Sequence, residues 1–542
     1  MLCYGEDMDK KATIFNSFYI EVFFKSWLFC CLVYSFMIFQ FWWGNHDWQP
    51  LIYTMGWKSG LFEARYSQHL FTAFFLSGHV LPVFYVLLSL GFLSLTGVLS
   101  AEYLCVPHDK KSYFLFVFLF VCSPYTFVLF HYVFIAVSMA MWGGILILLM
   151  KLAEPPYKFW KVVMMTLGFA FILGGYPPSI AFAFVVFCGR KIILYQSNKQ
   201  SFKQVLSDGL LMGVSAVCGL AASQLIIYVL KRSGNVVFQM YNVRTNSVTE
   251  MIEKIPQAFF GFFSSIIDIS QYLGWFYAFI TIIFCFGASF LILKNISNKI
   301  IGFMMLSILF LVARVSYIVS PSAEVASFRI DYWYFMAIVA VSISVFMQSR
   351  RQWLKNLVFA MSLITLIVFI RTDYEIQKVA LYKFKVERLF HKRLEENIVL
   401  HPNFDIKGGY GSLNFGYPDF FSHVCKNNCQ NYRNEVLDNL VLPSDLGYVL
   451  FWDEIKNPVS LKFGIWGDLF WRVYDPFLRN TWNAEKDDKI QDISMWLYVQ
   501  AKQYPHQRSI YVDNKYLLLN LDEMFFYRNR GLLSTELQGF KK

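Results

Sequence analysis

The sequence predicts a polytopic α-helical membrane protein with about eleven transmembrane helices, followed by a C-terminal soluble domain of mixed α/β structure. Of its 542 residues, 56% are hydrophobic and only 16% are charged, which is more apolar surface than one soluble core buries. The lysines and arginines occur in short clusters between long apolar runs. We therefore interpret the formal net charge of +11 as a topology signal and expect no nucleic-acid partner.

Most of the predicted helices correspond to single apolar runs, and two longer runs each predict a pair of shorter helices. The longer runs cover residues 112–150 and 162–189, with turn signals at Ser123-Pro124 and at Gly174-Gly175-Tyr176-Pro177-Pro178. One further helix is expected over residues 300–319 and carries Arg314. The single runs are residues 26–44, 70–101, 209–230, 269–293, 332–349 and 356–370.

Basic connectors predict the orientation of these helices, because cytoplasmic loops are enriched in lysine and arginine. With the N-terminus in the cytoplasm, all of the basic connectors fall on the cytoplasmic side. The outer side then receives residues 45–66, 231–268 and 320–331, and an odd number of spans places the C-terminal domain there too. The basic connectors are residues 110–111, 151–161, 190–203, 294–299 and 350–355.

The chain is expected to divide into a transmembrane domain over residues 1–370 and an extracytoplasmic, periplasmic domain over residues 371–542. The second domain has no apolar run of spanning length and alternates strand-like runs such as residues 448–452 with turn residues. Its first segment, residues 373–397, has apolar residues near helical spacing, which predicts an amphipathic helix.

Cys425 and Cys429 are the only cysteines of the second domain. Their spacing is too sparse for a zinc site, and an oxidising compartment favours a disulfide between them. His79 and His131 stand alone in apolar runs, which is more typical of hydrogen-bonded core residues than of metal ligands. The sequence predicts no metal site and no cofactor.

Charged and aromatic residues gather in the first outer segment. It reads Gly44-Asn45-His46-Asp47-Trp48 after the first apolar run, and Glu63-Ala64-Arg65-Tyr66 shortly before the second. A carboxylate at the mouth of a membrane cavity can act as general base on a sugar hydroxyl, and a nearby arginine can neutralise a phosphate leaving group. On composition alone, an ordinary solvated loop is the larger expectation.

These two segments, with the Gly174-Gly175-Tyr176-Pro177-Pro178-Ser179 turn, resemble the corresponding places in GtrII-type, serotype-converting glucosyltransferases, which belong to the GT-C class of membrane glycosyltransferases. The likeness is topological over most of residues 12–400 and motif-level only at these positions. It implies an enzyme of the bacterial inner membrane that moves a sugar from a polyprenyl phosphate to a lipid-linked O-antigen or similar glycan. Where the family has a fuller E-G-R-W-like string, this chain has Glu63-Ala64-Arg65-Tyr66, which leaves the sugar open.

The resemblance implies roles for individual residues of the first outer segment. Asp47 matches the acidic residue of the family's first outer loop and would deprotonate the acceptor in a single inverting displacement. Glu63 would orient the acceptor or Arg65, and Arg65 would bind the donor phosphate. Expected substrate-binding residues are His46, Trp48, Tyr66 and Glu324.

Two further arginines are candidates for the donor phosphate. Arg329 begins a predicted helix at the outer face, where a phosphate partner explains it about as well as snorkelling or a salt bridge to Glu324 or Asp331. Arg244 lies in an outer loop that could hold a glycan or a pyrophosphate, although an ordinary loop is the larger expectation.

Two rival functions stay open. A transporter or flippase of lipid-linked sugars also needs outward basic residues and many spans, although transporters often have two related halves. A glycan polymerase or ligase would use the same lipid-phosphate leaving group on a whole glycan chain. A nucleotide-sugar donor is not expected, because the sequence has no G-x-G-x-x-G turn.

Overall fold

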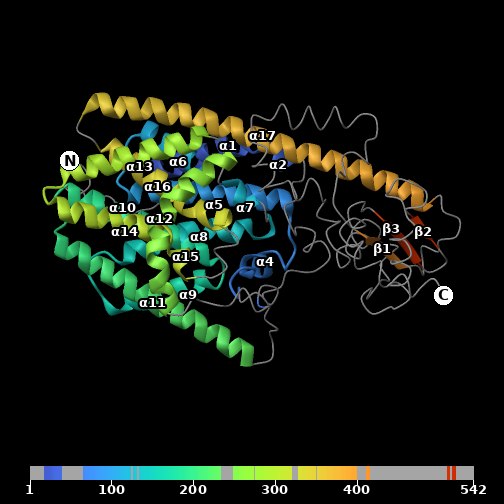
Figure 1. The fold of residues 1–542 in the computed structure, drawn as a ribbon, viewed down its shortest axis with the longest axis horizontal. Coiled ribbons are helices and arrows are strands. Elements are labelled where there is room, and N and C mark those ends of the chain that lie inside the picture. The colour runs from blue at the N-terminus through green and yellow to red at the C-terminus, as the bar shows by residue number, and fades with distance from the viewer. Residues whose placement is uncertain are drawn as a thin grey trace, which may run out of the picture. The chain divides into compact units, whose positions relative to one another are not determined.

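The computed structural model separates the chain into two compact units, residues 1–374 and 375–542, and most of the described residues are helical (Figure 1). The structure describes residues 17–39, 61, 65–123, 126–130, 133–232, 248–273, 275–319, 327–348, 351–399, 410–414, 510–512 and 516–520.

The first unit is a bundle of α-helices. Its helices are α1 (Ser17–Val33), α2 (Ser35–Phe39), α4 (Leu70–Phe75), α5 (Pro82–Tyr103), α6 (Lys110–Val121), α7 (Phe127–Phe130), α8 (Val133–Leu152), α9 (Phe159–Leu173), the 3-10 helix η4 (Pro177–Ser179), α10 (Ile180–Gln196), α11 (Phe202–Arg232), α12 (Val248–Leu273), α13 (Trp275–Asn295), α14 (Lys299–Ala313), α15 (Val315–Val319) and α16 (Ser327–Met347). The long helix α17 (Gln352–Val399) begins in this unit and continues into the second.

Three helical segments of the described chain are long and apolar enough to cross a membrane: Val83–Tyr103, Phe202–Leu230 and Gln352–Tyr374. Shorter apolar helices surround them, and α11 leaves Leu210, Val217 and Leu225 largely exposed. An exposed apolar face on a helix of spanning length suits contact with lipid. The structure thus agrees with a helical membrane protein, while the number of spans stays a prediction.

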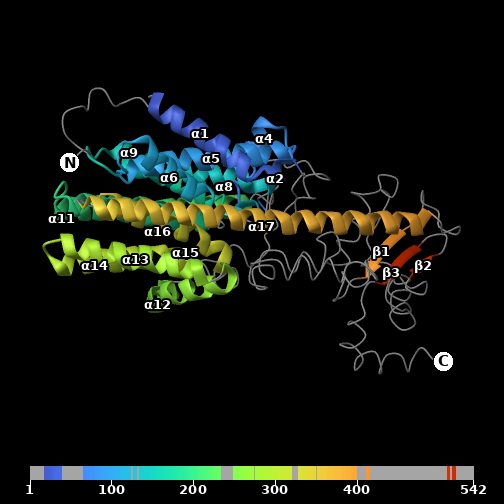
Figure 2. The ribbon, with the colours of Figure 1, turned by 90° about the horizontal axis from the view of Figure 1, so that it is seen from above.

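Helix pairs build the core of the first unit. α5 packs on α8, α9 on α11, and α10 on both α14 and α16. Helix α13 lies beside α12 and α16 (Figure 2). The largest fully buried side chains include Trp142 of α8 and Phe169 of α9. The close packing of α8 and α9 fixes the elements that hold the candidate site.

The predicted division of both long apolar runs is confirmed at the level of helices. Residues 112–150 divide into α6 and α8 with the short α7 between them, and residues 162–189 divide into α9 and α10 at the Gly174–Ser179 turn. The run over residues 70–101 was wrongly expected to be one helix. It breaks between α4 and α5, because Ser77 and Gly78 adopt positive φ angles of 50° and 83° and Pro82 starts a new helix.

The segment over residues 231–268, predicted to lie on the outer side, is helical in its second half, where α12 begins at Val248. Its charged residues, such as Glu250 and Glu253, belong to an amphipathic helix. Ala258 and Phe262 of α12 are buried, and α12 packs on α13 and α15. Residues 248–268 are therefore part of a helix that packs on its neighbours.

Three strands are described in the second unit: β1 (Tyr410–Asn414), β2 (Ile510–Val512) and β3 (Tyr516–Asn520). They form a sheet of order β1-β3-β2, with β1 parallel and β2 antiparallel to β3. Residues 373–397, predicted to be helical, lie within α17. The wider α/β domain stays a prediction, and residues 448–452, Cys425 and Cys429 lie outside the described residues.

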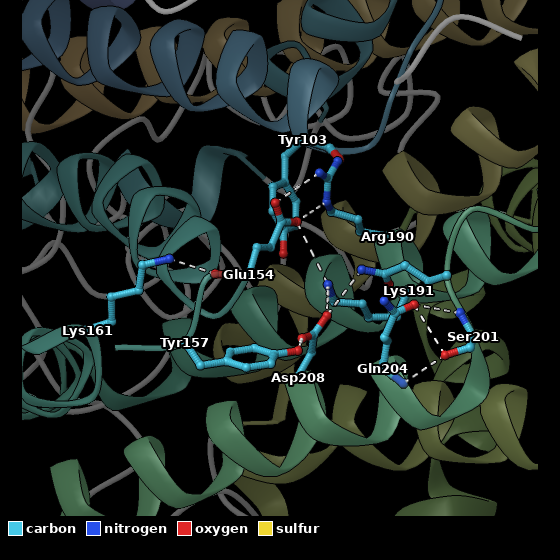
Figure 3. Close-up of polar contacts among 10 residues, drawn as sticks. Tyr103, Glu154, Tyr157, Lys161, Arg190, Lys191, Ser201, Gln204 and Asp208 are labelled. Atoms are coloured by element: carbon cyan, nitrogen blue, oxygen red, sulfur yellow. Dashed lines mark hydrogen bonds and ion pairs between the residues drawn. The ribbon is translucent and has the colours of Figure 1, made fainter. Parts of the chain in front are cut away.

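A buried ion-pair network joins α10, α11 and the connector between α8 and α9 (Figure 3). Arg190 donates through Nε and Nη2 to both carboxylate oxygens of Glu154, the second bond being 3.2 Å long. Lys191 Nζ lies 2.6 Å from Asp208 Oδ2, and these two residues are only 2% and 0% exposed. The Tyr157 hydroxyl donates to the other oxygen of Asp208. We call these residues the Glu154–Asp208 network.

This network corrects the expectation that Arg190 and Lys191 belong to a basic connector over residues 190–203. Both lie inside α10 and are buried, because carboxylates from other elements neutralise them. The Arg190 guanidinium also stacks over the ring of Tyr103, with Cζ 4.5 Å from the ring centre.

Further polar contacts bring the ends of other helices to the same end of the unit. Lys151 at the end of α8 pairs with Glu102 near the end of α5 at 3.0 Å. Gln348, just after α16, donates to the carbonyl oxygen of Cys105 at 3.2 Å. Residues 102–105, shortly before the connector predicted at 110–111, therefore lie at the same end of the helical unit as the connectors at 151–161 and 190–203.

Replacing Asp208 by Asn should destabilise the protein by up to about 3–5 kcal/mol, because the buried Lys191 ammonium keeps only Glu154, at 3.8 Å, as a carboxylate partner. The measurement is thermal unfolding of the purified protein in detergent. The double variant Lys191→Met/Asp208→Leu should lose less stability, since both charges are then absent. Glu102→Gln is the control, because its pair with Lys151 is partly exposed and should contribute under about 1 kcal/mol. An Asp208→Asn variant as stable as Glu102→Gln would show that the network contributes little.

Candidate functional site

The structure describes the side chains of two predicted site residues, Arg65 and Tyr66, and the backbone of a third, Arg329, in the first turn of α16. Arg65 and Tyr66 lie directly before α4, in a segment that continues through Ser67, Gln68 and His69. The predicted site residues outside the described part of the chain are His46, Asp47, Trp48, Glu63, Arg244, Glu324, Cys425 and Cys429.

Residues 66 and 67 cap the C-terminal end of α9. The Tyr66 hydroxyl donates to the carbonyl oxygen of Ala170, and Ser67 Oγ donates to that of Phe171, both at 2.5 Å. The Ser67 backbone N–H donates to the carbonyl oxygen of Gly174 at 2.9 Å. The last carbonyls of a helix often lack a backbone partner, and Ser67 supplies one to Phe171, whereas Tyr66 adds a second hydrogen bond to the Ala170 carbonyl, which already accepts from the Gly174 N–H at 3.0 Å.

The glycines of the turn after α9 allow this close approach. A Cβ atom on Gly174 would lie 2.2 Å from the Tyr66 ring, and one on Gly175 would lie 2.0 Å from the buried Trp142 ring and 2.8 Å from Ser67 Oγ. Real Cβ atoms do not come this close to other heavy atoms. The absence of side chains at Gly174 and Gly175 is therefore a packing requirement for Tyr66, Ser67 and Trp142.

Arg65, Gln68 and His69 form a hydrogen-bonded chain. Arg65 Nη1 donates to Gln68 Oε1 at 3.1 Å, and Gln68 Nε2 lies 3.2 Å from His69 Nε2. Ser138 of α8 donates through Oγ to the carbonyl oxygen of Gln68 at 2.7 Å. Burial, and then the charge of Arg65, lower the pKa of His69 from 6.5 to about 4, so His69 is neutral at pH 7.

Sequence reasoning did not single out Ser67, Gln68, His69 or Ser138. The one available signal is a run of three polar residues, Ser67 to His69, at the start of a long apolar run. All three are buried, which the sequence alone did not show.

The Arg65 segment, by which we mean residues 65–69, lies at one end of α9, and the Glu154–Asp208 network lies at the other. The segment contacts residues 170, 171 and 174, whereas Lys161 near the start of α9 donates to the Glu154 carbonyl oxygen at 2.7 Å. The helix has 15 residues, so the two polar clusters are separated by roughly 20 Å along it.

The two clusters differ in chemistry. The network pairs each of its cations with a carboxylate, which is typical of a structural role. In the Arg65 segment, an arginine is hydrogen-bonded to a neutral amide and lies next to a neutral histidine. Arginine recognises phosphate through its planar fork of N–H groups, so Arg65 is the residue of this segment that is suited to an anion.

Comparisons with protein-family models, with curated proteins and with solved structures find no match to this chain. The candidate site therefore depends on the geometry of the chain's own residues.

Replacing Gly174 by Ala should destabilise the protein by about 1–3 kcal/mol, because the new methyl group overlaps the Tyr66 ring. Thermal unfolding in detergent measures the effect. Gly209→Ala in α11 is the matched control, since nothing lies within 4 Å of a Cβ there, and it should be neutral or stabilising.

A second comparison isolates the contact itself. In a Tyr66→Ala background, Gly174→Ala should destabilise the protein much less, because the ring that the new methyl group overlaps is gone. Equal costs of Gly174→Ala in both backgrounds would mean that the turn does not pack against Tyr66.

Proposed function

We propose that this chain is a membrane glycosyltransferase that moves a sugar, glucose by the resemblance, from a polyprenyl-phosphate donor to a lipid-linked O-antigen or other cell-surface glycan. The observation that carries the proposal is the contact between the Arg65 segment and the turn after α9. Tyr66 and Ala170 are 104 positions apart in sequence, yet they are hydrogen-bonded, and Ser67 binds Gly174. Two of the three segments that resemble the GtrII-type enzymes thus lie together.

The proposed chemistry is a single inverting displacement at the anomeric carbon. Asp47 accepts the proton of the acceptor hydroxyl as that hydroxyl attacks, and the polyprenyl phosphate leaves as an anion that needs no acid. Glu63 orients the acceptor or Arg65. Arg65, with Arg329 and Arg244, neutralises the charge that develops on the departing phosphate.

The remaining proposed contacts are with the sugar and the acceptor. His46, Trp48 and Glu324 are assigned to substrate binding by their place in the outer segments. Tyr66 uses its hydroxyl to cap α9, so a sugar would contact its ring rather than its hydroxyl.

The proposed location is the bacterial inner membrane, with about eleven spans, a cytoplasmic N-terminus and a periplasmic C-terminal domain. The arrangement along α9 supports this orientation. The basic connectors of residues 151–161 and 190–203 lie at one end of α9, and the Arg65 segment lies at the other. A donor site at the outer end is what a sugar carried on an outward-facing lipid requires.

The orientation predicts where reporters are active. A reporter that works only in the periplasm should be active when fused after Lys542 and inactive when fused after Lys199. The physical reason is that basic residues near helix ends are retained on the cytoplasmic side. The opposite pattern would place Asp47 and Arg65 in the cytoplasm and remove the proposed donor site.

The proposed base predicts that Asp47→Asn inserts and binds the lipid donor but transfers sugar on the order of 100-fold to 10,000-fold more slowly. The amide keeps the shape of the carboxylate but cannot accept the acceptor's proton. The measurement is a turnover assay with a polyprenyl-phosphate sugar and a lipid-linked acceptor glycan.

Glu63→Gln is the matched variant, because Glu63 is the other acid of this outer segment. An active Asp47→Asn together with an inactive Glu63→Gln would move the base to Glu63. Full activity of both variants would rule out this site.

A further inference from the structure

We propose that Gln68 and His69 are positioning residues that hold the guanidinium of Arg65 in one orientation toward a phosphate monoester. The inference rests on the proposed function, in which Arg65 binds the donor phosphate. It adds two residues that neither the sequence pattern nor the family resemblance singles out.

The hydrogen-bonding chemistry of Arg65 fixes the orientation of the Gln68 amide. A guanidinium has only donors, so the Gln68 atom that faces Arg65 Nη1 at 3.1 Å must be the acceptor Oε1. The amide Nε2 then faces His69 Nε2 at 3.2 Å. Because an amide nitrogen only donates, His69 Nε2 must be an acceptor and its ring must be neutral.

The surroundings keep His69 in that neutral state. His69 is 4% exposed, and burial with the nearby charge of Arg65 lowers its pKa to about 4. A protonated ring would direct an N–H group at the Gln68 amide nitrogen. Rotating the amide to relieve this contact would direct its NH₂ group at Arg65. The hydrogen bonds from Arg65 through Gln68 to His69 therefore have one consistent arrangement.

Helix α8 anchors this arrangement. Ser138 donates to the Gln68 carbonyl oxygen at 2.7 Å, and Gln68 is only 4% exposed, so its backbone and side chain have little freedom. The Gln68 backbone N–H also donates to the Arg65 carbonyl oxygen at 3.2 Å. Arginine recognises phosphate through a planar fork of N–H groups, so its affinity depends on the plane in which the guanidinium is held.

The test is binding of farnesyl phosphate, a short polyprenyl monophosphate, to the full chain in detergent, with farnesol as the probe that lacks the phosphate. Gln68→Leu and His69→Leu should each weaken binding by roughly tenfold, because the guanidinium loses its fixed orientation. His69→Gln should bind like the unmodified protein, since its amide oxygen can accept from Gln68. Gln352→Leu, on the exposed start of α17, is the matched control and should also be unchanged.

A double-mutant cycle separates positioning from a general structural effect. If Gln68 acts through Arg65, then Gln68→Leu should weaken binding by less than about twofold in an Arg65→Lys background. A purely structural role would give the same factor in both backgrounds and would overturn the inference. If Gln68→Leu does not fold, the comparison of His69→Leu with His69→Gln decides the question, and equal binding by these two would overturn it.

The outcomes also distinguish this inference from the proposed function. Binding of farnesyl phosphate no tighter than that of farnesol would overturn both the positioning role and the phosphate site. Tight binding that is insensitive to Gln68 and His69 would overturn the positioning role alone. Binding that depends on both residues, in a protein that transfers no sugar, would support the positioning role and contradict glycosyl transfer.

Discussion

The docking of Tyr66 and Ser67 against the C-terminal end of α9 is the interaction on which the candidate site depends. Backbone carbonyls at a helix end need a partner, and in a lipid environment an unsatisfied carbonyl costs several kcal/mol. Ser67 supplies a partner to the Phe171 carbonyl, and Tyr66 adds a second bond to the Ala170 carbonyl, which also accepts from the Gly174 N–H. Arg65 is covalently joined to this cap, so the same bonds that complete α9 also place the guanidinium.

Two polar clusters lie at opposite ends of α9, and they differ in the groups that contact their cations. At one end the Glu154–Asp208 network neutralises buried cations within the protein. At the other end Arg65 is hydrogen-bonded to a neutral amide, so its charge is oriented rather than neutralised by that contact. The first arrangement stabilises a fold. The main physical support for a donor site at the Arg65 end is the contact between the Arg65 segment and the turn after α9.

The sequence predicted the fold best where glycine and proline mark turns. The Gly174–Pro178 segment correctly divided α9 from α10, but the break at Ser77 and Gly78 was missed because the residues around it are apolar. Charged residues were a poorer guide to where helices end. Arg190 and Lys191 were expected in a connector, because their partners Glu154 and Asp208 come from other elements and such pairing cannot be seen in one sequence. Gln68 and His69 were missed because their burial cannot be seen in one sequence.

The central claim is that the chain adds a sugar to a lipid-linked glycan, and the masses of lipid-linked glycans from cells with and without the protein test it most directly. The account predicts glycans heavier by one hexose when the protein is present. A mass increase of a whole repeating unit would instead indicate a polymerase or ligase. Unchanged masses, with lipid-linked sugars moved across the membrane, would contradict the account and support a transporter.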